Sequence, residues 1–599
     1  MCGIFAYVGS DNKASQKVLE GLKLLEYRGY DSWGIASRIQ NSKFKIQNSK
    51  FTLEKHVGKI GNAELSSELS ANSSQLALGH TRWATHGGVT VENAHPHLDC
   101  KKEIAVIHNG IVENFQEIKH ELVKKRHVFT SQTDTEVIPH LIEEYLKKEG
   151  FASSVKDAFN RLKGLNAIVV AYAPSSEIIA AKTGSPLVMG HATDGFYIAS
   201  DASGIIKHTK KVIFLKDNEM VILGKNIQLV SLSGGQKITP RYETINWKIE
   251  DEEKGAYKHF LIKEIHEQLN VIEYIALNSL ADSNKLANLI DKAFGTFMLG
   301  CGTASYAALA GTYLFSRIAK KHVNFSIGSE FTYLIDYLTP ESLVIPISQS
   351  GETIDVVSSI EHAKEKSSKI AAVVNVRGST IYRQADEKIL LYAGPEKAVV
   401  GTKSFTAMVA ILLLSAFSLA KKQNEGKKLL HQASKNIRDI LKENYIKEIK
   451  KVVEKIKKKE HIYIIGRGLS YAAALETSLK IKETSYMHAE GFAGGELKHG
   501  VIALIEKGTP CIVIAPLDET YDDIISNAAE IAARGGFIIG IGPKNNSVFD
   551  AFLPTEDCRD ATFIPQVVIA QVLAYNLALS RGISDPDKPR NLAKSVTVK

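Results

Sequence analysis

The stretch FMLGCGTASYAALAGTYLFSR, residues 297–317, decides the fold of the second half of the chain, because YIIGRGLSYAAALETSLKIKE at 463–483 parallels it. Each stretch runs from an apolar strand through a Gly-x-Gly turn into a helix. A repeated strand–turn–helix unit indicates two copies of one domain. Apolar strands alternate with long helices around both copies, which favours parallel α/β layers. We therefore expect two α/β domains, over residues 279–425 and 426–585.

The first 240 residues have a different pattern, in which short strand-like runs outnumber helices. This pattern predicts an α+β domain over 1–240, followed by a polar linker and a connecting helix over 241–278. A tandem duplication, IQNSKFK at 39–45 and IQNSKFT at 46–52, predicts an extended hairpin tip. The expected strands are Ile4–Val8, Gly34–Arg38, Leu76–His80, Ile104–His108, Ala167–Ala171, Phe196–Ser200 and Val212–Leu215, and the expected helices are Ala14–Tyr27, Glu136–Lys148 and Ser153–Arg161.

The composition is typical of a multi-domain globular protein. A chain of 599 residues exceeds one ordinary core, so about three or four domains are expected. The net charge of +8 is mild for this length, and no Arg-rich stripe with interleaved aromatics indicates nucleic-acid binding. The 5 cysteines are scattered and form no CxxC pair, which argues against disulfides and zinc knuckles. The apolar stretch Ala407–Leu419 predicts a buried helix, and we expect a cytoplasmic protein.

The N-terminus, Met1-Cys2-Gly3-Ile4-Phe5, carries a candidate nucleophile. Methionine before a small residue is normally removed, and Cys2 would then carry both a thiol and a free α-amine. An α-amine has a pKa of about 8, so it can accept the thiol proton and act as a general base. A cysteine at this position alone is weak support for catalysis. The surrounding motifs strengthen the prediction that Cys2 is catalytic.

Five loop-type strings rich in Gly, Asn, Thr and His lie beside the expected strands. They are YRGYDS at 27–32, GHTRWATHG at 79–87, ENAHPH at 92–97, HNGIVEN at 108–114 and TDTE at 133–136. Together and in this order they resemble the N-terminal-nucleophile (class II) glutamine amidotransferase domain over most of residues 2–240. The resemblance implies an αββα sandwich in which Cys2 attacks the glutamine amide and forms a γ-glutamyl thioester.

The resemblance also implies roles for residues around Cys2. Asn109 and the Gly110 N–H would form the oxyanion hole, where donors meet the charge that develops on the tetrahedral intermediate. Arg82 would bind the glutamine α-carboxylate, and Asp134 the α-amine. The other implied residues are Thr85 and His86 in a loop closing over glutamine, and Trp83 as a gate for ammonia. His95 and His97 could suggest a metal, but two histidines in a Pro-containing turn are more often ordered loop residues, and we expect no metal site.

The string SQSGET at 348–353 follows the apolar run Leu343–Ile347. Hydroxyls, a glycine and exposed backbone N–H groups at a strand end suit a phosphate, although a plain helix cap has the same composition. With the duplicated glycine turns, it resembles the sugar isomerase (SIS) domain, which binds phosphosugars.

A second constellation lies on the helix of the second copy. Glu476, Lys480 and Glu483 are spaced i, i+4 and i+7, so they share one face. An ordinary surface ion-pair ladder has the same spacing. However, the segment continues into the Gly-rich HAEGFAGGELKHG at 488–500, which contains His499. The chain ends PRNLAKSVTVK at 589–599.

In combination, these features resemble the family of isomerizing glutamine–fructose-6-phosphate aminotransferases over essentially the whole chain. The resemblance implies that Lys594 forms a Schiff base with the sugar carbonyl. His499 would assist ring opening, Glu483 would move a proton between C1 and C2, and Lys480 would hold negative charge. The tail over 586–599 would lie at the domain interface. The implied phosphate contacts are Thr303, Ser348, Gln349, Ser350 and Thr353.

Three residues depart from the family pattern: Ala304 and Gly401 stand where Ser is common, and Leu269 where Pro is usual. The first two favour an alternative, an aminotransferase for another keto-sugar phosphate. A non-catalytic sugar-phosphate sensor is a third hypothesis, which intact Cys2 and Lys594 oppose. We expect glutamine and fructose 6-phosphate as substrates, no cofactor, no nucleic-acid or membrane partner, and a homodimer in which His499 could cross the interface.

Overall fold

The computed structural model describes residues 2–38, 49–71, 73–175, 177–224, 226–245 and 254–596. The chain divides into two compact units. The first contains Met1–Glu253 and Ala593–Lys599, and the second contains Lys254–Leu592. Residues 39–48 of the duplicated segment and 246–253 of the expected linker lie outside the described residues, so the predicted hairpin tip stays a prediction.

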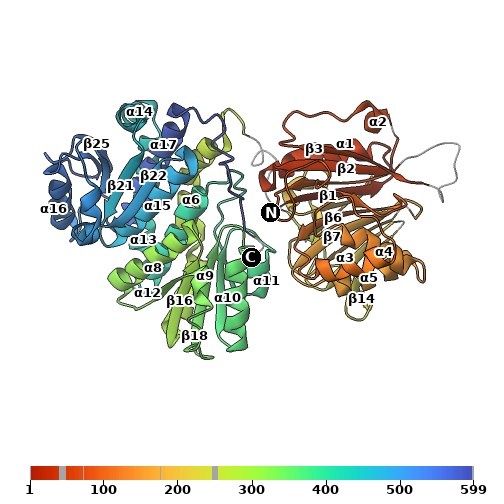
Figure 1. The fold of residues 1–599 in the computed structure, drawn as a ribbon. Coiled ribbons are helices and arrows are strands. Elements are labelled where there is room, and N and C mark those ends of the chain that lie inside the picture. Colours follow the sequence, from red (N-terminus) through yellow and green to blue (C-terminus); the bar gives the residue numbers. More distant parts are fainter. Residues whose placement is uncertain are drawn as a thin grey trace. The chain divides into compact units, whose positions relative to one another are not determined.

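The first unit contains two stacked antiparallel sheets (Figure 1). In the first sheet the described strands follow the order β15-β11-β9-β10-β1-β4-β2-β3, and in the second β14-β13-β12-β8-β7-β6-β5. The strands of the first sheet are β1 (Gly3–Gly9), β2 (Ser32–Arg38), β3 (Phe51–Val57), β4 (Leu76–Arg82), β9 (Val188–Ala192), β10 (Gly195–Ala199), β11 (Lys211–Phe214) and β15 (Glu243–Thr244). Those of the second are β5 (His97–Leu98), β6 (Ile104–Gly110), β7 (Asn166–Tyr172), β8 (Glu177–Lys182), β12 (Glu219–Leu223), β13 (Ile227–Ser231) and β14 (Lys237–Ile238).

Helices cover the outer face of each sheet (Figure 1). Helix α1 packs on the first sheet, and α3, α4 and α5 pack on the second. This is the αββα sandwich expected from the sequence. The helical elements of the unit are α1 (Ala14–Leu25), η1 (Glu26–Arg28), α2 (Ser67–Ala71), α3 (Phe115–Lys124), α4 (Val137–Leu146), α5 (Phe151–Arg161) and η3 (Ala202–Gly204).

Burial on both faces explains why the central strands are apolar throughout. In β1, Ile4 and Ala6 pack between the two sheets, whereas Phe5 and Tyr7 face α1. Successive side chains of a strand point to opposite faces, so a strand in the middle of four layers has no solvent-facing position.

The second unit contains two parallel sheets with equivalent strand orders, β17-β16-β18-β19-β20 and β22-β21-β23-β24-β25. This confirms the two α/β copies expected from the repeat. The first sheet comprises β16 (Gly295–Gly300), β17 (Asn324–Ile327), β18 (Ser342–Ser348), β19 (Lys369–Val374) and β20 (Glu387–Leu390). The second comprises β21 (His461–Gly466), β22 (His488–Ala493), β23 (Pro510–Ile514), β24 (Phe537–Gly542) and β25 (Ala551–Pro554).

The two copies repeat the same backbone turn. Gly302 and Gly468 have φ of 54° and 53°, a region that favours glycine, and each opens a helix of 17 residues. These helices are α8 (Thr303–Ala319) and α15 (Leu469–Ser485), and the two pack against each other. The structure thus shows that the Gly-x-Gly turns are equivalent and that the helices following them are neighbours.

A single core joins both copies. Helix α12 (Lys403–Leu419) is buried from Lys403 to Ser418, as expected for the apolar stretch.

Among the described residues one helix, Arg559–Ser580, is long and apolar enough to cross a membrane, and 94% of its apolar window is buried inside the protein. The remaining helical elements are α6 (Phe260–Asn278), α7 (Leu280–Lys292), α9 (Gly328–Phe331), α10 (Ile354–Glu365), α11 (Thr380–Gln384), α13 (Gln423–Ile440), α14 (Glu443–Ile456), α16 (Tyr521–Ala532), α17 (Phe563–Ser580), η5 (Gly494–His499), η6 (Val501–Leu504) and η7 (Arg559–Ala561).

Candidate active sites

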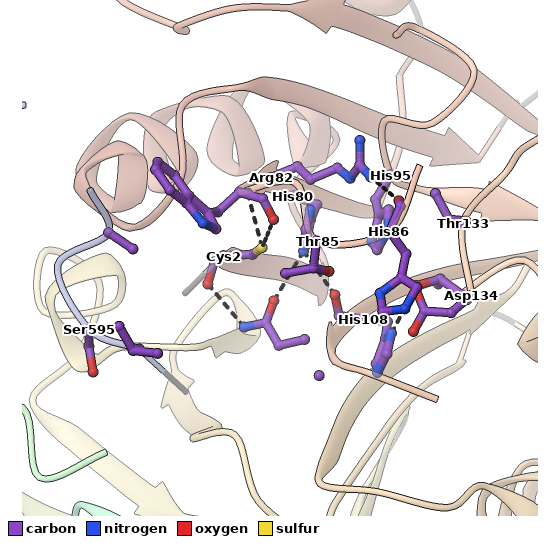
Figure 2. A pocket seen from close by; sticks show the side chains of 16 residues that line it. Cys2, His80, Arg82, Thr85, His86, His95, His108, Thr133, Asp134 and Ser595 are labelled. Carbon is purple, nitrogen blue, oxygen red and sulfur yellow. Dashed lines mark hydrogen bonds between the residues drawn. The ribbon is translucent and has the colours of Figure 1, made fainter. Parts of the chain in front are cut away.

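A pocket in the first unit gathers the residues predicted to process glutamine (Figure 2). The strand pairing brings them together: β1 pairs with β4 so that Gly3 lies opposite Thr81, which puts Cys2 beside Trp83. The predicted residues that line the pocket are Cys2, Arg82, Trp83, Thr85, His86, Asn109, Gly110 and Asp134.

The Cys2 thiol is half-buried and held by backbone groups. The Trp83 N–H donates to Sγ at 3.1 Å, and the Trp83 carbonyl oxygen lies 3.5 Å from it. Burial raises the pKa of the thiol, and the Trp83 N–H and the nearby Arg82 and Arg28 only partly offset this effect. A protonated thiol at neutral pH needs a base to become a nucleophile, which is the role predicted for the α-amine of Cys2.

Asn109, the predicted oxyanion-hole donor, points its amide nitrogen toward the Cys2 backbone. Its Nδ2 donates to the Cys2 carbonyl oxygen at 3.0 Å, and its Oδ1 lies 3.1 Å from His80 Nε2. Burial lowers the pKa of His80 to about 3, so the ring is neutral and its Nε2–H can donate to Oδ1. His80 therefore fixes which end of the Asn109 amide faces Cys2.

Gly110 allows the chain to pass close to β7. Its φ is +130°, and a Cβ there would lie 2.3 Å from the Leu165 carbonyl oxygen. Any other residue would displace the backbone N–H that the sequence assigns to the oxyanion hole.

Arg82 anchors the loop predicted to close over glutamine. Its guanidinium donates to the carbonyl oxygens of Gly87 and Gly88 at 3.1 and 3.0 Å, and also to that of His86. On the far wall of the pocket, Asp134 Oδ2 accepts the Val112 N–H at 2.7 Å. The roles of Arg82 and Asp134 toward the two ends of glutamine stay predictions.

Several histidines without an expected catalytic role line the pocket or lie beside it. His95 stacks on His80 with ring centroids 4.2 Å apart, and His97 Nε2 lies 3.0 Å from Thr133 Oγ1. Burial lowers the pKa of both His95 and His97 well below the usual value. His80 and His108 were missed, although a histidine within a strand buried on both faces is a detectable signal, since its ring needs a hydrogen-bond partner.

The C-terminal tail also reaches this pocket. Ala593, Ser595 and Val596 contribute to its lining, and they belong to the first unit (Figure 2). Lys594 is half-buried within the same segment. The other residues predicted to handle the sugar phosphate belong to the second unit.

The predicted phosphate site follows two neighbouring parallel strands. β16 pairs with β18, and Thr303 and Ser348 come at or just after their carboxyl ends, where ligands bind in open α/β sheets. Ser348 Oγ accepts the Gly351 N–H at 3.0 Å and lies 3.3 Å from Thr353 Oγ1. Gln349 and Ser350 are half-buried in the same turn.

A buried charge cluster lies beside Thr303. Lys480 Nζ is 2.6 Å from Glu483 Oε2, 3.4 Å from Glu476 Oε1 and 3.0 Å from Thr303 Oγ1. The side chains of Lys480 and Glu476 are 1% and 0% exposed, so the surface ion-pair ladder is excluded.

Burial and charge decide the protonation of this cluster. Burial lowers the pKa of Lys480, but Glu476 and Glu483 outweigh it and raise the value to about 12. Burial raises the pKa of Glu476 to about 8. At neutral pH the cluster therefore holds a charged Lys480 beside Glu483, with Glu476 largely protonated.

His499 is exposed at the end of η5, and among the described residues no hydrogen bond or ion pair of its ring joins it to this cluster. Ala304, one of the two departures from the family pattern, is buried. The hydroxyl of the next residue, Ser305, donates to the Gly302 carbonyl oxygen at 2.7 Å. A Cβ on Gly401 would lie 3.5 Å from Ser404 Oγ, its nearest neighbour, which is an ordinary van der Waals contact, so a Cβ fits there.

Comparison with known proteins identifies two domain families in the chain. Residues 80–207 match the glutamine amidotransferase domain family, and residues 289–418 and 455–552 match the SIS domain family. A glutamine–fructose-6-phosphate aminotransferase (isomerizing) from Pyrococcus horikoshii is 41% identical over 611 residues, covering 100% of both chains. The chain belongs to the family of isomerizing glutamine–fructose-6-phosphate aminotransferases.

Two further comparisons support the membership in this family. The aminotransferase of the same name from Thermococcus kodakarensis is 40% identical over 618 residues, again covering 100% of both chains. The C-terminal domain of glucosamine-fructose-6-phosphate aminotransferase from Francisella tularensis is 31% identical, with a TM-score of 0.50, and the match covers 55% of this chain and 98% of that domain. The family and fold class expected from the sequence are confirmed.

Proposed function

We propose that this chain releases ammonia from glutamine at Cys2 and uses it to convert fructose 6-phosphate to glucosamine 6-phosphate. The observation that carries the proposal is the buried Lys480–Glu483 pair beside Thr303 in a chain that also holds an oriented Cys2–Asn109 pair. The Lys480–Glu483 pair provides a carboxylate for proton transfer next to a turn suited to phosphate. The Cys2–Asn109 pair provides an ammonia source.

In the first half-reaction the α-amine of Cys2, freed by removal of Met1, accepts the thiol proton. The thiolate attacks the glutamine amide carbon, and the oxyanion receives hydrogen bonds from Asn109 Nδ2 and the Gly110 N–H. Collapse of the intermediate expels ammonia and leaves a thioester on Cys2. Water then releases glutamate. Arg82 and Asp134 hold the α-carboxylate and α-amine of the substrate.

In the second half-reaction the Lys594 amine condenses with the C2 carbonyl of the sugar and water leaves. Ammonia then displaces Lys594 and gives a fructosimine. Glu483 removes a proton from C1 and returns it to C2, which converts the imine to the amino sugar. Lys480, already charged, balances the negative charge that develops on the sugar.

The exposure of His499 supports a further part of the proposal, a homodimer in which His499 of a second copy assists ring opening. We place the enzyme in the cytoplasm, as the scattered free cysteines favour a reducing compartment. Glutamine and the sugar phosphate are its partners, with no cofactor, nucleic acid or membrane.

Ala304 and Gly401 favour a second candidate, another ketose phosphate, because Gly401 leaves space beside Thr303 where a hydroxyl could stand. Product formation with a panel of ketose phosphates separates the two. We expect glucosamine 6-phosphate from fructose 6-phosphate with the highest kcat/KM of the panel. No product from fructose 6-phosphate, with turnover of another ketose, would establish the second candidate.

The tail assignment has its own test. Lys594→Ala should keep basal glutamine hydrolysis but lose sugar turnover, because the Schiff base depends on this amine. Lys588→Ala serves as a charge-matched control, because Lys588 lies six positions before Lys594 in the same tail. Sugar turnover that survives in Lys594→Ala would refute the assignment.

A further inference from the structure

Four potential metal ligands meet in the first unit, among residues that the glutamine chemistry does not use. Cys100 lies in the turn between β5 and β6, and His127 lies in the turn between α3 and α4. His140 and Glu143 are three residues apart on α4. One ligand atom from each of the four lies within 4.8 Å of all the others. The cluster is mostly buried, with Cys100 at its exposed edge.

The distances within this cluster fit a tetrahedral cation. His127 Nδ1 and His140 Nδ1 are 3.3 Å apart, and Cys100 Sγ lies 3.6 and 3.5 Å from them. Glu143 Oε2 lies 3.2 Å from His127 Nδ1 and 3.8 Å from His140 Nδ1. Zinc bonds of about 2.0–2.3 Å in tetrahedral geometry place ligand atoms roughly 3.3–3.8 Å apart.

A second carboxylate orients one of the ligands. His127 Nε2 lies 2.8 Å from Glu144 Oε1, so Nε2–H donates to this carboxylate and the lone pair of Nδ1 faces the cluster. A carboxylate behind a histidine ligand is the usual arrangement around protein-bound metals.

We propose that Cys100, His127, His140 and Glu143 bind one Zn²⁺ ion. The donor set of one thiolate, two imidazoles and one carboxylate suits Zn²⁺ better than Mg²⁺ or Ca²⁺, which prefer oxygen ligands. Four protein ligands complete the coordination, so the site is structural and has no open position for a substrate.

The ion would connect two walls of the glutamine pocket. The Cys100 turn follows β5, which begins at His97, and α4 follows the segment Thr133–Thr135. His97 and Thr133 are themselves hydrogen-bonded at 3.0 Å. Zinc would therefore stabilise the arrangement of these walls without contacting glutamine.

The test is metal analysis of the full chain purified without chelators, followed by Co²⁺ substitution. We expect one zinc per chain, release of that zinc by a thiol-specific mercurial, and visible tetrahedral Co²⁺ bands with thiolate-to-cobalt charge transfer. The paired variant Cys100→Ser with His127→Ala should bind no zinc, and Glu144→Gln should weaken zinc binding by roughly 10- to 100-fold.

His120→Ala is the matched control, because His120 is an exposed histidine on α3 of the same unit. It should keep the full zinc content. The Glu144→Gln variant retains all four ligands, so its reduced affinity can be measured even where the paired variant does not fold. Wild-type chain that stays metal-free after incubation with Zn²⁺ and gives no tetrahedral Co²⁺ spectrum would overturn the proposal.

Discussion

The glutamine pocket and the sugar-phosphate cluster bury polar groups in opposite ways. Around Cys2 the His80 imidazole is neutral, since burial lowers its pKa to about 3. Its hydrogen bond sets the orientation of the Asn109 side chain. Around Thr303 a buried charge persists, because Glu476 and Glu483 raise the pKa of Lys480 to about 12. The first site should be sensitive to the orientation of its groups, and the second to the loss of any one charge.

The largest effect should come from removing the nucleophile. Cys2→Ala should lower glutamine hydrolysis by at least about 10⁴-fold, since no other group can form the thioester. Isomerisation of the sugar phosphate should continue, because the charge cluster is unchanged. Glutaminase and isomerase assays on one preparation measure both, and retained glutaminase activity would falsify the assignment of Cys2.

The second-largest effect should come from removing the charge of Lys480. Lys480→Met keeps the length of the side chain but leaves Glu483 without its partner, and losing one member of a buried pair typically costs about 3–5 kcal/mol. We expect lower stability in urea unfolding of the second unit and loss of isomerisation. Lys482→Met is the matched control, because Lys482 is an exposed lysine on the same helix, α15. Equal stability of the two variants would contradict a charged Lys480.

Disturbing the orientation of Asn109 tests the first site. Asn109→Ala removes an oxyanion donor and should lower kcat for glutamine hydrolysis by about 10²–10³-fold, with a smaller change in KM. His80→Ala should lower kcat less, because Asn109 remains but can turn its amide. An effect on KM alone in both variants would argue for a role in binding rather than in the transition state.

The smallest effect concerns pH. Burial raises the pKa of Glu476 to about 8 from an ordinary 4.5, so the stability that this group contributes is fully present below about pH 4.5 and is lost as the pH rises through 8. Glu476→Gln removes this dependence. Between about pH 5 and 9 the variant should lose less stability than wild type, as measured by urea unfolding at a series of pH values. Parallel stability profiles would contradict a protonated Glu476.

Much of the fold follows from local sequence. The repeat at 297–317 and 463–483 predicts two equivalent units, and the φ values of Gly302 and Gly468 confirm that the two turns are alike. The strand containing Ile4–Val8 is apolar at every position, which is the pattern of a strand covered on both faces. Helix α3 was missed because it buries only Ile118 and Leu122 in an otherwise polar segment.

The candidate sites also differ in how far the sequence predicts them. Cys2 and Asn109 belong to contiguous motifs, so their sequence strings carry the information. The cluster of Cys100, His127, His140 and Glu143 combines three separate segments, in which only His140 and Glu143 are close in sequence, so no metal site was expected. Tertiary packing alone brings these ligands together.

The central claim is that ammonia released at Cys2 becomes the amino group of the sugar. It is tested most directly with glutamine labelled with ¹⁵N in the amide, fructose 6-phosphate and an excess of unlabelled ammonium, followed by mass analysis of the amino sugar. The account predicts glucosamine 6-phosphate that carries the ¹⁵N label in wild type, and no labelled product in Cys2→Ala. Wild-type product with the isotope content of the free ammonium would contradict it.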